Sequence, residues 1–253
     1  MLAVLVVPAP HARADLRQRI TAADAYVATR PGTVGYVIRD RATGASYRNG
    51  SAGALVWTAS TIKLAMVVDL LARERAGQIA LSAADRQLMV QMLHASDNGA
   101  ADTLWKRYGG PDNMAFNRNF PRYGMTGLQP QRGFGDTFPY WGFQKSSTDD
   151  LDRLMNFTLS GLPASDAAAV VAEMQHPDSN QQWGVWGAGP SMTPGNKNGW
   201  SLEQGGWVVN TVGFAGPGQR YTLAIMNSLG DQGGYDEGVE TTTRLSAILL
   251  APA

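Results

Sequence analysis

A serine and a lysine stand three residues apart at the start of an apolar segment. Ser60 and Lys63 are followed by Met66, Leu70 and Leu71, whose spacing predicts a helix with Lys63 one turn beyond Ser60 on the same face. The start of a helix offers unpaired N–H groups and a partial positive charge. Burial disfavours the charged form of a lysine. A neutral lysine can take the proton of a serine hydroxyl, so the pair could supply a nucleophile and its base.

This pair also has a simpler, structural interpretation. Serine is common at the N-cap of a helix, and a nearby lysine is usually a solvated charge. Two observations favour chemistry. The chain has only four lysines in 253 residues, and Lys63 is flanked by Ile62 and Leu64 rather than by polar side chains.

Charge and composition narrow the classes of function. The 21 basic and 21 acidic residues balance, so nothing indicates a nucleic-acid partner. The absence of cysteine excludes disulfides and thiolate chemistry. The histidines His11, His94 and His176 show no i,i+4 pair, so we expect no metal site and no cofactor.

The N-terminal residues resemble the end of a secretory signal peptide. An apolar run over 2–7 precedes Ala12-Arg13-Ala14, although a positively charged start is missing. We therefore expect residues 1–14 to be a signal-peptide remnant and the protein to be secreted or held at the cell envelope. If the run is not such a remnant, the protein is cytoplasmic. No apolar run approaches the ~20 residues that a membrane-spanning helix needs.

The surrounding pattern predicts an α/β (α+β) fold. Strands are expected at 33–39, 45–48, 207–214 and 221–227. Helices are expected at 15–29, from 60 to a stop at 77, at 82–108 with a break at 96–99, and at 112–120, 147–159, 164–174 and 239–250. The two blocks of strands should pair into one antiparallel sheet flanked by the N- and C-terminal helices, with the other helices as an inserted all-helical lobe. We expect a single domain over 15–253, with a sheet lobe of about 15–58 and 197–253 and a helical lobe of about 59–196.

Two irregular stretches interrupt this order, at 121–145 and 175–195. Loops of this length are often functional. The second stretch and the strand after it carry four tryptophans, which are either core and rim residues or the lining of an aryl pocket: Trp183, Trp186, Trp200 and Trp207. We expect His94 to be a packed or capping residue rather than a catalytic one.

Three short motifs follow one another along the chain: Ser60-x-x-Lys63, Ser96-Asp97-Asn98, and Lys197-Asn198-Gly199 just before a predicted strand. Taken singly, the second is an N-cap or Asx turn and the third a turn. As an ordered set they resemble the serine β-lactamase and penicillin-binding-protein superfamily, and the class A β-lactamases most closely. Further segments agree with this resemblance: Gly35–Asp40 with Thr43-Gly44, Gly109-Gly110-Pro111, and Ser147-Thr148.

The resemblance implies a catalytic role for four residues. Ser60 would be the acylated nucleophile and Lys63 its general base. Ser96 would relay a proton to the leaving group, and Lys197 would keep Ser96 polarised and supply positive potential. Amide or ester cleavage needs a nucleophile, a base, an acid for the leaving group and an oxyanion site.

The resemblance also implies a substrate-binding set. Asn98 would hydrogen-bond the acyl amide of the substrate, and the backbone N–H groups of Ser60 and Trp200 would form the oxyanion hole. Asn198 and Gly199 complete this set.

Three departures from the family pattern bear on function. Asn198 replaces the hydroxyl residue that helps to hold a substrate carboxylate, and the interval from Lys63 to Ser96 is shorter than in class A enzymes. Those enzymes also carry a deacylating glutamate between the second and third motifs. The loop at 121–145 offers only Asp136, which we interpret as a solvated turn residue.

The expected function is a serine acyl-transfer hydrolase that acts on a small amide or ester and deacylates slowly. One alternative is a transacylase, esterase or D-Ala-type peptidase whose substrate is not a β-lactam. Another is a penicillin-binding-like protein that binds its ligand with little turnover. We expect a monomer without a nucleic-acid partner or a transmembrane segment.

Overall fold

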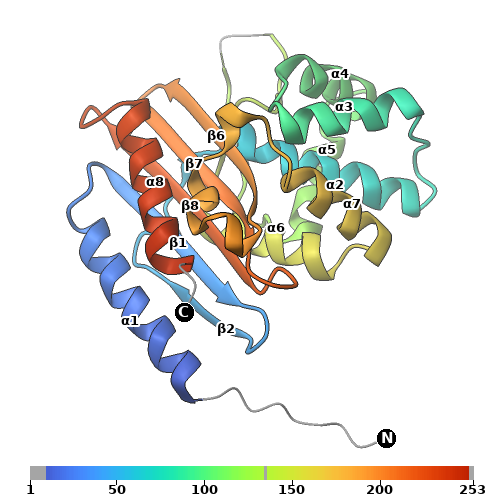
Figure 1. Cartoon of the computed structure of the whole chain (residues 1–253). Coiled ribbons are helices and arrows are strands. Elements are labelled where there is room, and N and C mark those ends of the chain that lie inside the picture. The colour runs from blue at the N-terminus through green and yellow to red at the C-terminus, as the bar shows by residue number, and fades with distance from the viewer. Residues whose placement is uncertain (1–9, 134–135, 251–253) are drawn as a thin grey trace, which may run out of the picture.

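A five-stranded antiparallel sheet lies between two terminal helices and a block of further helices (Figure 1). The computed structural model describes residues 10–133 and 136–250, with residues 10–15 described by their backbone alone. The predicted fold class is therefore confirmed. Residues 1–9, which hold most of the predicted signal remnant, lie outside the described residues.

The strand order in the sheet is β2-β1-β8-β7-β6, with every neighbouring pair antiparallel. The bounds are β1 Thr33–Asp40, β2 Ala45–Arg48, β6 Gly195–Glu203, β7 Gly206–Ala215 and β8 Tyr221–Gly230. The predicted pairing of the N-terminal and C-terminal strands is confirmed through β1 and β8.

Strand β6 is not among the predicted strands. The sequence pattern predicts that Lys197-Asn198-Gly199 come just before a strand, whereas these residues lie inside β6. Glycine and asparagine have low strand propensity, and the strand forms because it pairs with β7 along its whole length, from Gly195 opposite Phe214 to Glu203 opposite Gly206.

The terminal helices α1 (Pro10–Val27) and α8 (Tyr235–Leu250) cover one face of the sheet, as predicted (Figure 1). Helix α1 begins at Pro10, earlier than the predicted start at residue 15. Asp24 fastens it to the sheet, because its two oxygens accept hydrogen bonds from the hydroxyls of Tyr36 and Tyr47 at 2.6 Å each. Apolar side chains fill the interior between these layers, among them Ile38, Leu223, Ile225, Leu245 and Leu249.

The other face of the sheet packs against the helical block. Its members are α2 Ile62–Arg75, α3 Ala83–His94, α4 Asn98–Tyr108, α5 Ala115–Asn119, α6 Thr148–Ser160 and α7 Ala164–Met174. Helix α2 is buried on all sides from Ile62 to Leu71, as expected for a helix at the centre of a lobe. It therefore gives the first motif a rigid support.

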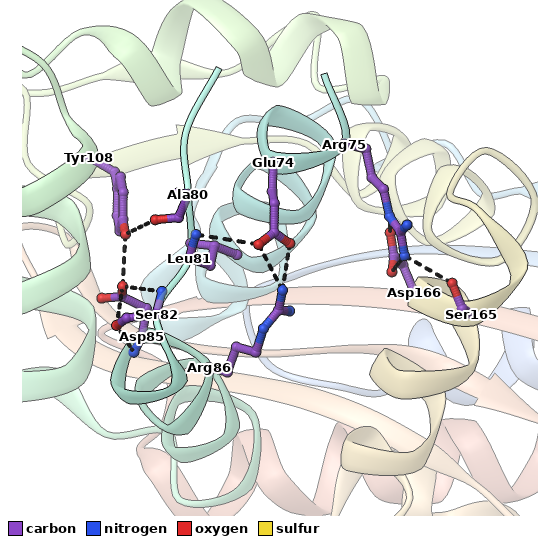
Figure 2. Close-up of polar contacts among 10 residues, drawn as sticks. All are labelled: Glu74, Arg75, Ala80, Leu81, Ser82, Asp85, Arg86, Tyr108, Ser165 and Asp166. Atoms are coloured by element: carbon purple, nitrogen blue, oxygen red, sulfur yellow. Dashed lines mark hydrogen bonds and ion pairs between the residues drawn. The ribbon is translucent and has the colours of Figure 1, made fainter. Parts of the chain in front are cut away.

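Ion pairs join the C-terminal end of α2 to its neighbouring helices (Figure 2). Glu74 accepts two hydrogen bonds from Arg86 of α3, at 2.7 Å each. Arg75 pairs with Asp166 of α7 at 2.6 Å. Such contacts tie α2 to both neighbouring helices at the end remote from Ser60.

Short elements connect the two lobes. A small sheet of order β3-β5-β4 joins β3 Val56–Trp57, β5 Gln144–Ser146 and β4 Gln129–Pro130. The second irregular stretch contains 3₁₀ turns at Ser179–Gln181, Gly184–Ala188 and Pro190–Met192. Across the described residues, no helix combines the length and apolar character required to cross a bilayer.

Candidate active site

Ser60 lies in a 3₁₀ turn, η1 (Ala59–Thr61), that leads directly into α2. The predicted helix is thus confirmed, with its α-helical part beginning at Ile62. Ala59 has a φ of 45°, in the left-handed region, which costs about 1–2 kcal/mol for a residue with a Cβ. Strain of this kind is concentrated at functional sites. The Ser60 side chain is partly exposed at this turn.

Lys63 is fully buried, and its amine is directed to the second motif. Nζ donates to the Ser96 carbonyl at 2.5 Å and to Asn98 Oδ1 at 2.7 Å, and lies 3.4 Å from Ser96 Oγ. Within the described residues, none of these hydrogen bonds goes to Ser60. Burial lowers the pKa of Lys63 to about 7, although Asp97 and Asp102 act in the opposite direction. The neutral form of the amine is therefore accessible near neutral pH.

The second motif forms the break between α3 and α4. Asp97 caps α4 by accepting from the Ala100 N–H at 2.6 Å, so the structural interpretation holds for that residue. Ser96 adopts a φ of 58° and is buried. Asn98 Oδ1 is used by Lys63, while its Nδ2 has no partner among the described residues and lies on an exposed side chain.

Lys197 reaches the same serine from β6. It is buried, and its Nζ donates to Ser96 Oγ and to the Asn198 carbonyl at 2.8 Å each. Burial holds the pKa of Lys197 well below its ordinary value, and the charge of Lys63 lowers it further. Ser96 Oγ thus lies between two buried amines from opposite lobes.

Gly199 brings the edge of the sheet against the turn that carries Ser60. A Cβ at this position would lie 2.7 Å from the Ser60 nitrogen and 2.6 Å from the Thr61 nitrogen. A close approach of two backbones requires glycine. The backbone of the third motif and the N–H of Ser60 are therefore held side by side.

The Asn198 side chain is not brought to the lysines. Successive side chains of a strand point to opposite faces, and Asn198 Nδ2 donates to the carbonyls of Gln181 and Trp183, at 2.8 and 3.3 Å. The Asn198 Oδ1 is buried and has no partner among the described residues. Its predicted contact with substrate stays a prediction.

Three of the four tryptophans near the third motif, Trp183, Trp200 and Trp207, pack in one aromatic cluster with Tyr235. Trp200 contacts Trp183 and Tyr235 with ring centroids 5.8 and 5.7 Å apart, and Trp207 contacts Tyr235 at 6.1 Å. These contacts support the core-and-rim interpretation. His94 closes α3 and contacts Glu173 at 2.5 Å, in keeping with a packing role.

One contact of Lys63 is not predictable from the motifs. The ring of Trp141, in the loop between β4 and β5, lies 4.6 Å from Lys63 Nζ. The only advance signal was the concentration of aromatic residues in this loop. Asp136, the acid of the same loop, has an exposed side chain, as expected for a solvated turn residue.

Comparison with solved structures identifies the class of fold. A β-lactamase from Streptosporangium roseum aligns with a TM-score of 0.74 at 17% identity, over 92% of this chain and 97% of the other. An ancestral class A β-lactamase gives 0.74 at 16% identity, over 93% and 98%. The class A β-lactamase PenP from Rhodopseudomonas palustris, described as putative, gives 0.74 at 16%, over 92% and 98%. The chain has the fold of the serine β-lactamase-like superfamily.

Sequence comparison then gives the nearer relationship. No family model matches the chain. "Putative lipoprotein LppW" of Mycobacterium tuberculosis and Mycobacterium bovis is 30% identical over 221 residues, which cover 83% of this chain and 68% of the relative. The chain belongs to the LppW family.

Proposed function

We propose that the protein is a serine acyl-transfer hydrolase that forms an acyl-enzyme at Ser60 and releases it slowly. The observation that supports this most is the position of Ser96 Oγ between two buried lysine amines, at 2.8 Å from Lys197 and 3.4 Å from Lys63. Two lysines with lowered pKa values around one hydroxyl are costly to fold. Such groups are concentrated at sites that move protons.

In the proposed acylation step, neutral Lys63 takes the proton of the Ser60 hydroxyl as Oγ attacks the acyl carbon. The negative charge then develops on the carbonyl oxygen, which the N–H groups of Ser60 and Trp200 would receive. A donor of this kind is worth about 3–4 kcal/mol. Ser96 gives its proton to the departing nitrogen or oxygen, and the Lys63 ammonium formed in the first step, with its Nζ 3.4 Å from Ser96 Oγ, reprotonates Ser96 and becomes neutral again.

Release of the acyl group is the step for which the site supplies the fewest catalytic groups. The one acid of the loop at 121–145, Asp136, is exposed, and the residue of this loop that contacts Lys63 is Trp141 rather than a carboxylate. A general base typically contributes about 10²–10⁴-fold. We therefore expect slow attack by water, with an amine or alcohol acceptor as the more effective nucleophile. The alternatives are a transacylase, esterase or D-Ala-type peptidase that acts on a substrate other than a β-lactam, and a penicillin-binding-like protein with little turnover.

The acyl donor is not expected to need a carboxylate. Asn198 stands where the family has a carboxylate-binding hydroxyl residue, and its amide is engaged by the carbonyls of Gln181 and Trp183. Matched esters with and without a carboxylate at the leaving-group side should therefore react at similar rates.

A panel of chromogenic esters, thioesters and β-lactams tests the proposal. The wild type should release the leaving group in a burst that Ser60→Ala abolishes. Ser46→Ala is the control, because Ser46 is exposed on β2, at the opposite edge of the sheet from β6. Equal reaction in Ser60→Ala and wild type would reject Ser60 as the nucleophile.

We propose that the protein is located at the cell envelope. The relative is named a lipoprotein, and the predicted export signal agrees with that name. Fractionation of cells that make the full natural chain should recover it with the envelope or the medium. Recovery in the cytoplasm alone would contradict the proposal.

A further inference from the structure

Trp141 contacts Lys63, the proposed base, from a loop outside the three motifs. Its ring centroid lies 4.6 Å from Lys63 Nζ, and the side chain is 5% exposed. The indole Nε1 donates to Asp102 Oδ1 at 2.7 Å, and the same oxygen accepts from the Tyr140 hydroxyl at 2.6 Å. The orientation of the ring is thus fixed by a carboxylate of α4.

Helix α4 therefore acts on Lys63 in two ways. Asn98 and Asp102 are four residues apart, which places them on one face of the helix. Asn98 contacts Lys63 directly at 2.7 Å, and Asp102 reaches it through the ring of Trp141. Helix α4 thus positions both a hydrogen-bond acceptor of the Lys63 amine and the aromatic ring beside that amine.

The face of the ring has consequences for both forms of the amine. An aromatic face is negative, so it attracts an ammonium, and the more strongly where water is excluded. A neutral amine has two N–H groups and one lone pair. The two N–H groups can donate to the Ser96 carbonyl and to Asn98 Oδ1. The ring repels that lone pair and leaves it directed away from the loop.

We propose that Trp141, fixed by Asp102, is a positioning residue of Lys63 that excludes water from the amine, stabilises its ammonium form and turns the lone pair of its neutral form away from the loop. This inference rests on the proposed function of Lys63 as the base. The other charged groups that act at the amine are Asp97, on the α4 side, and Lys197, from β6.

Three replacements of Trp141 separate these effects. Trp141→Ala gives water access to the Lys63 amine, so the pKa of Lys63 should rise toward its ordinary value. Trp141→Leu keeps the site apolar but removes the ring, so the pKa should fall by about half to one unit. Trp141→Phe keeps an aromatic face and should restore a pKa close to that of the wild type.

The titration can be observed directly, because the chain has only four lysines. Protein labelled with ¹³Cε-lysine is titrated by NMR, with resonances assigned from single Lys→Arg variants. Trp207→Leu is the matched control, since Trp207 contacts Tyr235 in the aromatic cluster near the third motif. Asp102→Asn retains an acceptor for Trp141 but removes a charge that raises the pKa of Lys63, so that pKa should fall.

The pH profile of Ser60 acylation by an activated ester is measured on the same variants. Its acidic limb should move with the NMR pKa, upward for Trp141→Ala and downward for Trp141→Leu. A pKa of Lys63 that is unchanged in both variants would overturn the proposal, even if both proteins lose stability. If Trp141→Ala does not fold, the Leu and Phe variants decide the matter. Shifted NMR titrations in a protein whose Ser60 is never acylated would support the positioning role and reject the proposed function.

Discussion

At the level of single residues, loss of either buried lysine should affect acylation differently. Lys63→Ala removes the proposed base and should abolish acylation of Ser60. Lys197→Ala removes positive potential and the 2.8 Å contact with Ser96, and should slow acylation without abolishing it. Rates come from stopped-flow with an activated ester, with Lys106→Ala, an exposed lysine of α4, as the control. Near-normal acylation in Lys63→Ala would show that another group is the base.

The pH dependence of acylation should report Lys63. Only the neutral amine can accept the proton, and burial lowers the pKa of Lys63 to about 7 from 10.5. The second-order rate constant should therefore rise as pH increases through about 7 and level off above it. A constant that rises only near pH 10 would mean that the amine is not desolvated in solution.

Single residues also mark the limit of what the sequence could predict. The roles of Ser96 and Lys197 were expected only through the resemblance, since each motif alone has a structural interpretation. Trp141 was missed because its contact joins residues 63 and 141, and no local pattern encodes a contact at that separation. Asn198 was assigned to substrate without knowledge of the strand alternation that turns it toward Gln181.

At the level of elements, the contact between β6 and η1 should be sensitive to a single methyl group. In Gly199→Ala the Cβ would meet the Ser60 nitrogen at 2.7 Å, so β6 or η1 must move and the oxyanion site should widen. We expect acylation to fall by about 10²-fold or more, as for loss of an oxyanion donor. Gly50→Ala is the control, because a Cβ there meets nothing within 4 Å. Equal acylation rates in the two variants would contradict the proposed oxyanion geometry.

The cap of α3 should affect stability without affecting chemistry. Ser82 accepts from the Asp85 N–H, and Asp85 accepts in return from the Ser82 N–H, which forms a capping box (Figure 2). Ser82→Ala should lower the free energy of unfolding by about 1 kcal/mol, measured by urea denaturation against Ser46→Ala. The acylation rate should stay unchanged. A Ser82→Ala protein as stable as the control would show that the box contributes nothing.

Elements with a strong local signal were predicted well. Helix α7 has the predicted bounds, Ala164–Met174, because a periodic apolar face follows Pro163 directly. Strand β6 was missed because its Gly195-to-Gly199 segment favours a turn locally and becomes a strand only by pairing with β7. Tertiary pairing overrode local propensity there.

At the level of the whole molecule, the site exists because two lobes meet. Turn η1 supplies Ser60 and helix α2 supplies Lys63. The α3–α4 break supplies Ser96, and β6 supplies Lys197 from the sheet. The antiparallel sheet and the covering helices were predictable from alternation and helical periodicity. The closeness of the three motifs was not, because it depends on how the helical block rests on the sheet.

The measurement that bears most directly on the account is intact-mass spectrometry of the protein quenched at intervals after mixing with an activated ester. The wild type and Asp136→Asn should both gain the mass of one acyl group at Ser60 within the burst and lose it slowly, and faster when an amine acceptor is added. Ser60→Ala should gain none. Labelling that persists in Ser60→Ala, or a wild type that turns over rapidly without ever carrying the acyl mass, would contradict the account.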